Sequence, residues 1–328
     1  MTSTLAPAAP RRRMDGRLVV LLVVIALSTR GLLRGSLDPV ALRTWTTVFV
    51  AIVVQALPFL ALGVLVSGAV TALVSPAVLE RALPRSTVLA VPGAALAGTA
   101  LPGCECASVP IAGRLCARGV QPAAAVTFML AAPAVNPVVL VATAVAFPGQ
   151  PQMVLARFLG SLGTSVVVGL VWSRVGGQAW VERARDRAAG ADGGPRWVAF
   201  TSAARHDLWD AGGWLVVGAA AAATLQVVVP RSLVAAVADH PVLSVLALGG
   251  LAVLLAICSE ADAFVAASLR EFSLTARLVF LVVGPATDVK LIAMQAGLFG
   301  RRFAARFAPL TFAVAVVCAL AAAQVVLR

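Results

Sequence analysis

The stretch TALPGCECASVPIAGRLCARG, residues 99–119, places a glutamate between two cysteines in the middle of very apolar sequence. A Pro-Gly pair at 102–103 precedes this cluster, and Pro110 follows it. Proline and glycine interrupt helices, so we expect the chain to leave regular helical structure there. Non-helical backbone at membrane depth survives only beside protein or a water-filled cavity. The cluster is therefore predicted to line an internal site.

The composition of the chain predicts a membrane protein. Of its 328 residues, 60% are hydrophobic and 12% are charged, whereas soluble domains have roughly 45–50% apolar and about 25% charged residues. The net charge of +12 lies mostly between apolar runs. Such charge encodes orientation and contact with anionic lipid, so we expect the bilayer as a partner and no nucleic acid. Five cysteines in a chain of this size do not make a secreted disulfide framework.

The apolar runs predict an all-α polytopic protein with about 7–9 transmembrane spans. Runs of spanning length occur at 44–72, 120–146, 152–174, 207–229, 275–297 and 306–327. Residues 17–36 form a weaker span, and 87–118 and 241–272 are apolar regions broken by Pro, Gly or charge. The expected organisation is a basic cytoplasmic tail (1–16), a first transmembrane helix and loop (17–43), a first repeat (44–175), a polar cytoplasmic linker (176–206) and a second repeat (207–328). A signal peptide is the alternative for the N-terminal segment, but no small-residue cleavage site follows it.

The two halves share four features in the same order, which predicts an internal duplication. CECAS at 104–108 matches CSEAD at 258–262, and PAVN at 133–136 matches PATD at 285–288, at offsets of 154 and 152 residues. If the two broken regions are re-entrant, each half crosses the membrane three times and the repeats are inverted. If both broken regions cross fully, the repeats are parallel. The distribution of arginine favours the inverted arrangement in the inner membrane.

The polar residues of the broken regions are the candidate site. In an extended segment Cys104, Cys106 and Ser108 would share a face. Cys258, Glu260 and Asp262 would do the same in the second half. A Cys-x-Cys pair suits soft metal ions or trivalent metalloids, so Cys104 and Cys106 are also candidate metal ligands. The alternative is that these cysteines are small packing residues.

Ionisable groups inside a membrane cost roughly 2.5–3.5 kcal/mol each, so they are functional candidates by default. Glu105, Glu260, Asp262 and Asp288 qualify, together with Lys290, the only lysine of the chain. Glu260 and Asp262 could instead lie at a hairpin tip in water, and Asp288 and Lys290 could offset each other structurally. Asn136 and Asp288 each stand three residues after a proline, where they can bond freed backbone or line a site.

Motifs of several enzyme classes are absent from the sequence. It has no G-x-x-x-x-G-K-[ST], no H-E-x-x-H and no G-x-S-x-G, so ATP hydrolysis, metalloprotease and serine hydrolase activities have no support. We therefore expect a transporter without a cofactor rather than an enzyme.

Two blocks of the chain resemble a known family. LPGCECASVPIAGRLCARGVQPAAAVTFMLAAPAVNPVVL at 101–140 and CSEADAFVAASL with GPATDVKLIAMQ within 258–295 are similar to the predicted permeases once called domain of unknown function 318. That family includes the organoarsenical efflux permeases. The resemblance implies an inner-membrane permease and, in the arsenical branch, energy-coupled export of trivalent organoarsenicals. By match to the motifs, it implies as site candidates Cys104, Cys106, Pro133, Asn136, Pro137, Cys258, Asp288 and Lys290. Pro285 is added from the repeat.

Three functions remain open from the sequence. The leading hypothesis is a secondary carrier that holds a small soft substrate on thiols and uses a carboxyl as the proton-coupling site. The second is a membrane subunit that needs a separately encoded partner, and a homodimer is a further arrangement. The third is a membrane thiol oxidoreductase using Cys104 and Cys106, against which the lack of a C-x-x-C motif weighs.

Overall fold

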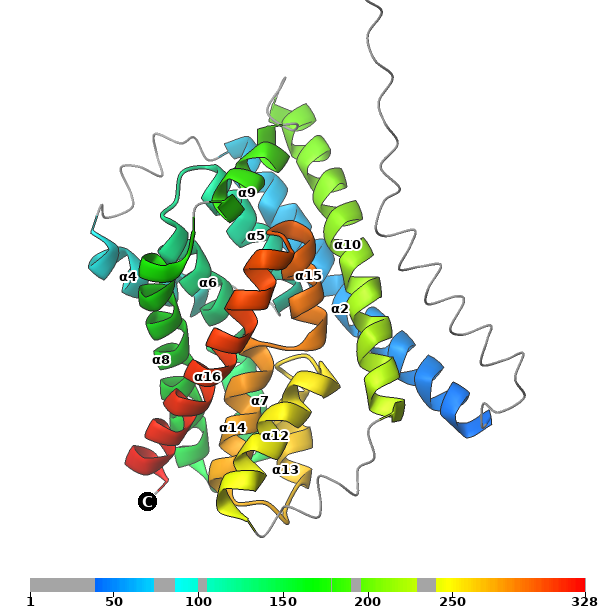
Figure 1. Ribbon diagram of the computed structural model, residues 1–328, viewed down its shortest axis with the longest axis vertical. Coiled ribbons are helices and arrows are strands. Elements are labelled where there is room, and N and C mark those ends of the chain that lie inside the picture. The colour runs from blue at the N-terminus through cyan, green and yellow to red at the C-terminus, as the bar shows by residue number, and fades with distance from the viewer. Residues whose placement is uncertain are drawn as a thin grey trace, which may run out of the picture.

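The computed structural model describes residues 39–73, 86–99, 105–177, 179–189, 196–228 and 240–327. These residues form helices joined by short turns, with no strand among them, which confirms the predicted all-α class (Figure 1). The predicted tail at 1–16, most of the segment 17–43, and Cys104 lie outside the described residues.

Five segments within the described ranges are long and apolar enough to cross a membrane. They are Val40–Ala69, Pro122–Ala146, Pro151–Val175, Leu274–Leu298 and Arg301–Val326. Shorter apolar helices occur at Leu89–Thr99 and Pro241–Leu255. The chain is therefore a multi-pass membrane protein, as its composition predicts.

The helices follow each other in a similar order in the two halves. The first half has α2 (Pro39–Leu73), α4 (Thr87–Thr99), α5 (Glu105–Ala117), α6 (Pro122–Ala134), α7 (Pro137–Ala146) and α8 (Pro151–Val175). After α9 (Ala179–Ala189), the second half has α10 (Arg196–Val228), α12 (Pro241–Leu255), α13 (Asp262–Ser268), α14 (Leu274–Ala286), α15 (Val289–Leu298) and α16 (Arg301–Val326). Helix α10 thus begins inside the predicted linker.

Corresponding long elements of the two halves run in opposite directions in Figure 1. Helices α2 and α8 run upward along the long axis, whereas α10 and α16 run downward. The broken pair α6–α7 descends and the pair α14–α15 ascends. Helix α2 packs against α10, and α8 packs against α16. The halves are therefore joined along antiparallel pairs of long helices.

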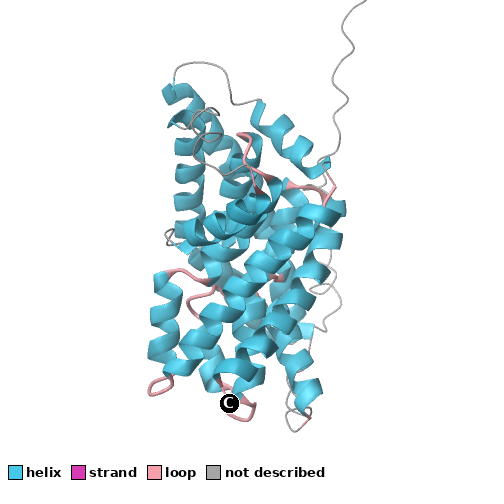
Figure 2. Cartoon of the chain, turned by 90° about the vertical axis from the view of Figure 1, so that its left-hand side faces the viewer, coloured by secondary structure: helices cyan, strands magenta, loops and turns pink. Residues whose placement is uncertain are grey.

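Several helices end near half-height, where short loops are visible in Figure 2. Helix α12 starts at the lower end and stops at Leu255, because Ala256 adopts a left-handed conformation with φ 49° and ψ 40°. The carbonyl of Cys258 then accepts from the N–H groups of Ala261 and Asp262, and α13 returns downward. Residues 241–268 thus form a hairpin that enters and leaves at one end, as expected for a re-entrant region.

The breaks at 135–136 and 287–288 follow from local chemistry. Asn136 is the N-cap of α7, and its Oδ1 accepts from the Val139 N–H at 3.0 Å. Asp288 is the N-cap of α15, and its Oδ1 accepts from the Leu291 N–H at 2.5 Å. A capping side chain satisfies one of the backbone donors that every helix start leaves free. The matching Pro-x-x-polar motifs therefore mark helix restarts inside two predicted spans.

Candidate functional site

A buried ion pair joins the start of α5 to the start of α15. The Lys290 ammonium donates to Oε1 of Glu105 at 2.5 Å and lies 3.9 Å from Oδ2 of Asp288. All three side chains are buried. Asp288, which precedes Lys290 by two residues, is thus the more distant of its two carboxylate contacts. Since Glu105 belongs to the first half and Lys290 to the second, this pair links the halves.

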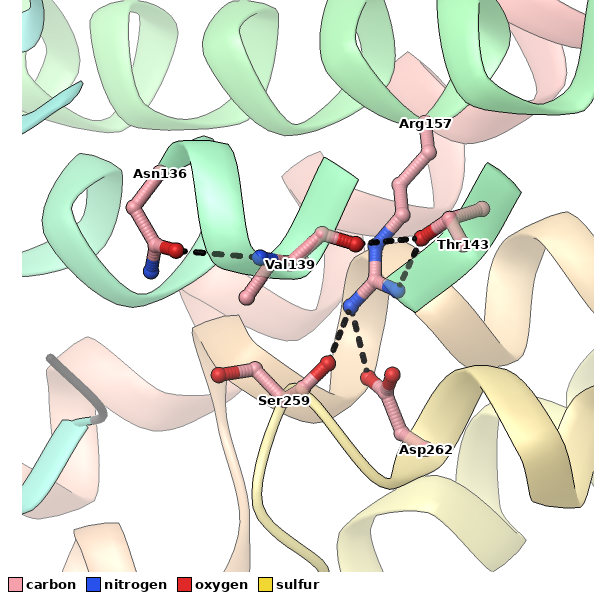
Figure 3. A network of polar contacts seen from close by, with 6 residues as sticks. All are labelled: Asn136, Val139, Thr143, Arg157, Ser259 and Asp262. Atoms are coloured by element: carbon pink, nitrogen blue, oxygen red, sulfur yellow. Dashed lines mark hydrogen bonds and ion pairs between the residues drawn. The ribbon is translucent and has the colours of Figure 1, made fainter. Parts of the chain in front are cut away.

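A second buried ion pair links the halves in the opposite sense (Figure 3). Nη2 of Arg157 on α8 donates to Oδ2 of Asp262 at 2.9 Å and to the Ser259 carbonyl at 3.0 Å. Its Nη1 donates to Oγ1 of Thr143 on α7 at 2.7 Å. Asp262 is the first residue of α13, as Glu105 is of α5. Each half therefore offers an acid, at the start of a half-helix, to a cation of the other half.

Carboxyl groups outnumber cations around these pairs. Among the described residues, four acids lie around two bases, namely Glu105, Glu260, Asp262 and Asp288 around Arg157 and Lys290. Glu260 lies within range of the charges of Glu105, Arg157 and Lys290, yet neither of its carboxyl oxygens has a hydrogen-bond partner among the described residues. An unpaired buried carboxylate is costly, so such a group favours a proton or another cation.

Two thiols lie in the same region. Cys106 on α5 and Cys258 in the loop after α12 are buried in one cluster with Leu291 and Met294 of α15. Both are free cysteines and lie within range of the Lys290 charge. No group of three or more His, Cys, Asp or Glu side chains in the described ranges is arranged to hold a metal ion. A metal-ligand role for Cys104 and Cys106 thus stays a prediction.

The expectation of extended backbone at the two clusters is wrong where the structure describes it. Residues 105–117 are α-helical through Pro110, so Cys106 and Ser108 do not share the face that alternation predicts. Ser108 donates to the Glu105 carbonyl at 3.2 Å within the same helix. The second cluster, 258–262, is a tight turn rather than a strand. Backbone hydrogen bonds inside each segment outweigh the extended form in both cases.

The prolines of the candidate list shape the backbone next to the site. Pro133 lies at the end of α6 and Pro137 begins α7, and both flank the cap residue Asn136. Pro285 lies at the end of α14, one turn before Asp288. Asn136 also donates from Nδ2 to the Ala132 carbonyl at 2.9 Å. These residues act through the helix breaks, and the break at 287–288 is what places Lys290 opposite Glu105.

Sequence reasoning missed Arg157, although an arginine within an apolar span is itself a signal. It also missed the contact of Arg114 with Asp207. Nη2 of Arg114 lies 2.9 Å from Oδ1 of Asp207, and the Ser67 hydroxyl donates to Oδ2 of the same carboxylate at 2.5 Å. This group ties α5 to α10 and α2. Arg114 is separated from Asp207 by 93 residues, so no local pattern predicts that they meet.

Replacing Arg157 with methionine is expected to lower the free energy of unfolding by about 3–5 kcal/mol, because Asp262 would remain as a buried charge without its partner. Denaturant unfolding of the purified protein in detergent measures this. The matched control is Arg174→Met, since Arg174 is exposed on the same helix. Equal free energies of unfolding for the two variants would show that the Arg157–Asp262 pair does not stabilise the protein to this extent.

Comparisons with known proteins find similar sequences among membrane permeases. The model of a family described as predicted permeases matches residues 41–324. The UPF0718 protein YcgR of Bacillus subtilis is 34% identical over 278 residues, which cover 83% of this chain and 94% of that protein. A Streptococcus mutans protein, provisionally named a two-component membrane permease complex subunit, is 29% identical over 266 residues, covering 79% of this chain and 88% of that protein. No solved structure matches the chain significantly.

Proposed function

This chain belongs to the family of predicted permeases, and from that premise we propose that it is a proton-coupled secondary carrier exporting a small soft substrate. The observation that carries the proposal is the pair of reciprocal ion pairs between the halves, with two buried thiols and an unpaired carboxyl beside them. A carrier needs a site between two bodies that can move against each other. The family supports a transporter rather than an enzyme.

We further propose that the halves are inverted repeats. The similar order of helices and their opposite directions in Figure 1 support this. In inverted-repeat carriers, substrate and coupling ion bind near the bilayer midplane at the repeat interface, beside broken helices. The starts of α5, α13 and α15 supply such helix ends here. During alternating access, one ion pair would be accessible from one side of the membrane in the first state. The other ion pair would be accessible from the opposite side in the second state.

The proposed substrate is a trivalent metalloid compound such as an organoarsenical. Cys106 and Cys258 offer soft ligands, to which Cys104 would add a third thiol by its sequence position. Binding of such a species to thiols releases protons. Glu260, with no partner for either oxygen in the described part of the chain, is the proposed acceptor. Substrate binding and proton transfer would therefore take place in one region.

The orientation of the chain is proposed from its charge. The turn at 118–121, helix α9 and the start of α16 lie at the upper end in Figure 1, and the turn at 147–150 lies at the lower end. Arg118, Arg183, Arg301 and Arg302 are thus at the upper end. At the lower end, the turn at 147–150 has no charged residue, and the turn between α13 and α14 carries Arg270 beside Glu271. Positive residues favour the cytoplasmic side. We therefore propose that the protein lies in the inner membrane with its upper end facing the cytoplasm.

A second candidate function is the membrane subunit of a two-component permease. The Streptococcus mutans relative, named as such a subunit, favours it. Affinity purification from a native-level expression strain would then recover a second membrane protein in stoichiometric amount. Full transport by the chain alone in reconstituted liposomes would exclude an obligatory partner.

Replacing Cys106 with serine is expected to lower export of a trivalent methylated arsenical by at least about tenfold, because serine removes a soft ligand. Uptake of the arsenical into everted vesicles, driven by an imposed pH gradient, measures this loss. The same assay with other metalloids, soft metal ions and organic anions measures the substrate range. Cys318→Ser is the matched control, since Cys318 lies on α16 outside the cluster. Unchanged arsenical uptake by Cys106→Ser would remove the thiol from the site.

A further inference from the structure

A cavity of about 790 Å³ opens at the upper end, between the end of α8, helix α9 and the turn from α15 to α16. Its rim carries Arg183 from α9 and Arg301, Arg302 and Arg306 from α16. No acidic residue of the described ranges lines it. None of these four arginines has an ion-pair partner within the described ranges. The cavity therefore gathers positive charge that the described protein does not neutralise.

The start of α16 adds to this charge. Gly300 caps the helix with φ +105°, offers no side-chain cap, and is followed by no acidic residue in the first turn. A Cβ at Gly300 would lie 3.4 Å from Nη1 of Arg183, so this guanidinium packs over the helix start. The N-terminus of a helix is itself positive and favours anions. A cation held against it is unfavourable unless an anion lies between or beside them.

Aromatic side chains line the cavity, and one of them carries a donor beside Gly176 that is unpartnered among the described residues. Trp172, Trp180, Phe299 and Phe303 pack together, with ring centroids of neighbours 5.0–5.4 Å apart. Trp172 lines the cavity and is only 4% exposed, yet its indole Nε1–H has no hydrogen-bond partner in the described part of the chain. A buried donor without a partner among the described residues points to an acceptor beyond them, which a bound ligand would supply.

We propose that this cavity binds the phosphate group of an anionic ligand, with an anionic phospholipid headgroup as its source. Guanidinium groups match the geometry of phosphate oxygens, and several of them converge here. The end of a transmembrane bundle with indole rings is the level at which headgroups lie. A free phosphate or phosphate ester shares the same chemistry and is the other source. This site is independent of the transport site proposed above.

Purified, delipidated full-length protein tests this proposal by native mass spectrometry and thermal unfolding. The probes are dioleoylphosphatidylglycerol, dioleoylphosphatidylcholine and inorganic phosphate. Wild type is compared with Arg183→Gln/Arg302→Gln. The matched control is Arg174→Gln/Arg185→Gln, two exposed arginines that do not line the cavity. All four substitutions replace exposed side chains, so we expect both double variants to fold. The melting temperature of each variant without lipid verifies this.

We expect phosphatidylglycerol to bind and stabilise wild type and the control, and to bind the Arg183/Arg302 variant at least about tenfold more weakly. Stabilisation by phosphatidylglycerol but not by inorganic phosphate assigns the site to lipid. Stabilisation by phosphate as well, with displacement of the lipid, assigns it to a soluble phosphate. Equal binding by the two double variants, or equal stabilisation by phosphatidylcholine, would overturn the proposal. Failure of both anions would also overturn it and leave an acidic protein segment as the occupant to test.

Discussion

Replacing Lys290 with methionine should lower the free energy of unfolding by about 3–5 kcal/mol and abolish transport, because it leaves Glu105 as a buried charge without a partner. The ammonium of Lys290 is fully buried and 2.5 Å from that carboxylate. Its backbone is also tightly packed, since a Cβ on Gly218 would lie 2.6 Å from the Lys290 Cα. Denaturant unfolding in detergent measures the loss.

The second variant separates charge from packing. Lys290→Met combined with Glu105→Gln removes both charges, so it should recover most of the lost stability while transport stays absent. A double variant as unstable as Lys290→Met alone would contradict the role of charge. Because Lys290 is the only lysine of the chain, an amine-reactive label mapped to this residue, apart from any at the N-terminal amine, also reports its exposure. We expect labelling of Lys290 to be slow in wild type and faster in Glu105→Gln.

Replacing Glu260 with glutamine is expected to abolish uphill export while exchange of substrate across the membrane continues. Among the carboxyls of the site, Glu260 is the one whose two oxygens both lack a partner within the described ranges. It is therefore the group most free to take up and release a proton, whereas Glu105 and Asp262 are paired with cations. Glutamine keeps the size of the side chain and removes its titration.

Everted vesicles with and without a pH gradient measure the effect. Glu271→Gln is the matched control, since Glu271 is an exposed acid of the same half, in the turn before α14. The free energy of unfolding of Glu260→Gln should stay within about 0.5 kcal/mol of wild type, because no hydrogen bond to another described residue is lost. Gradient-driven accumulation that persists in Glu260→Gln would assign the coupling to another group.

The local features of this protein could be predicted from its sequence. Apolar runs of spanning length predict the long helices, because hydrocarbon tolerates only backbone that bonds itself. The motifs PAVN and PATD predict helix breaks, since proline ends one helix and the following Asn136 or Asp288 caps the next. The family, too, is readable from such motifs. Each of these inferences depends on residues within a few turns of one another.

The pairing of the site could not be predicted in the same way. Glu105 is 185 residues from Lys290, and Arg157 is 105 residues from Asp262. Alternation along the chain predicts a face shared by Cys104, Cys106 and Ser108 in extended backbone, but the backbone of 105–117 satisfies its hydrogen bonds as a helix instead. The sequence by itself thus determined a membrane bundle with interrupted helices and a set of buried ionisable groups. Only the packing of two oppositely directed halves decided which acid neutralises which base and left Glu260 without a partner in the described chain, because electrostatic pairing depends on distance in space and not along the chain.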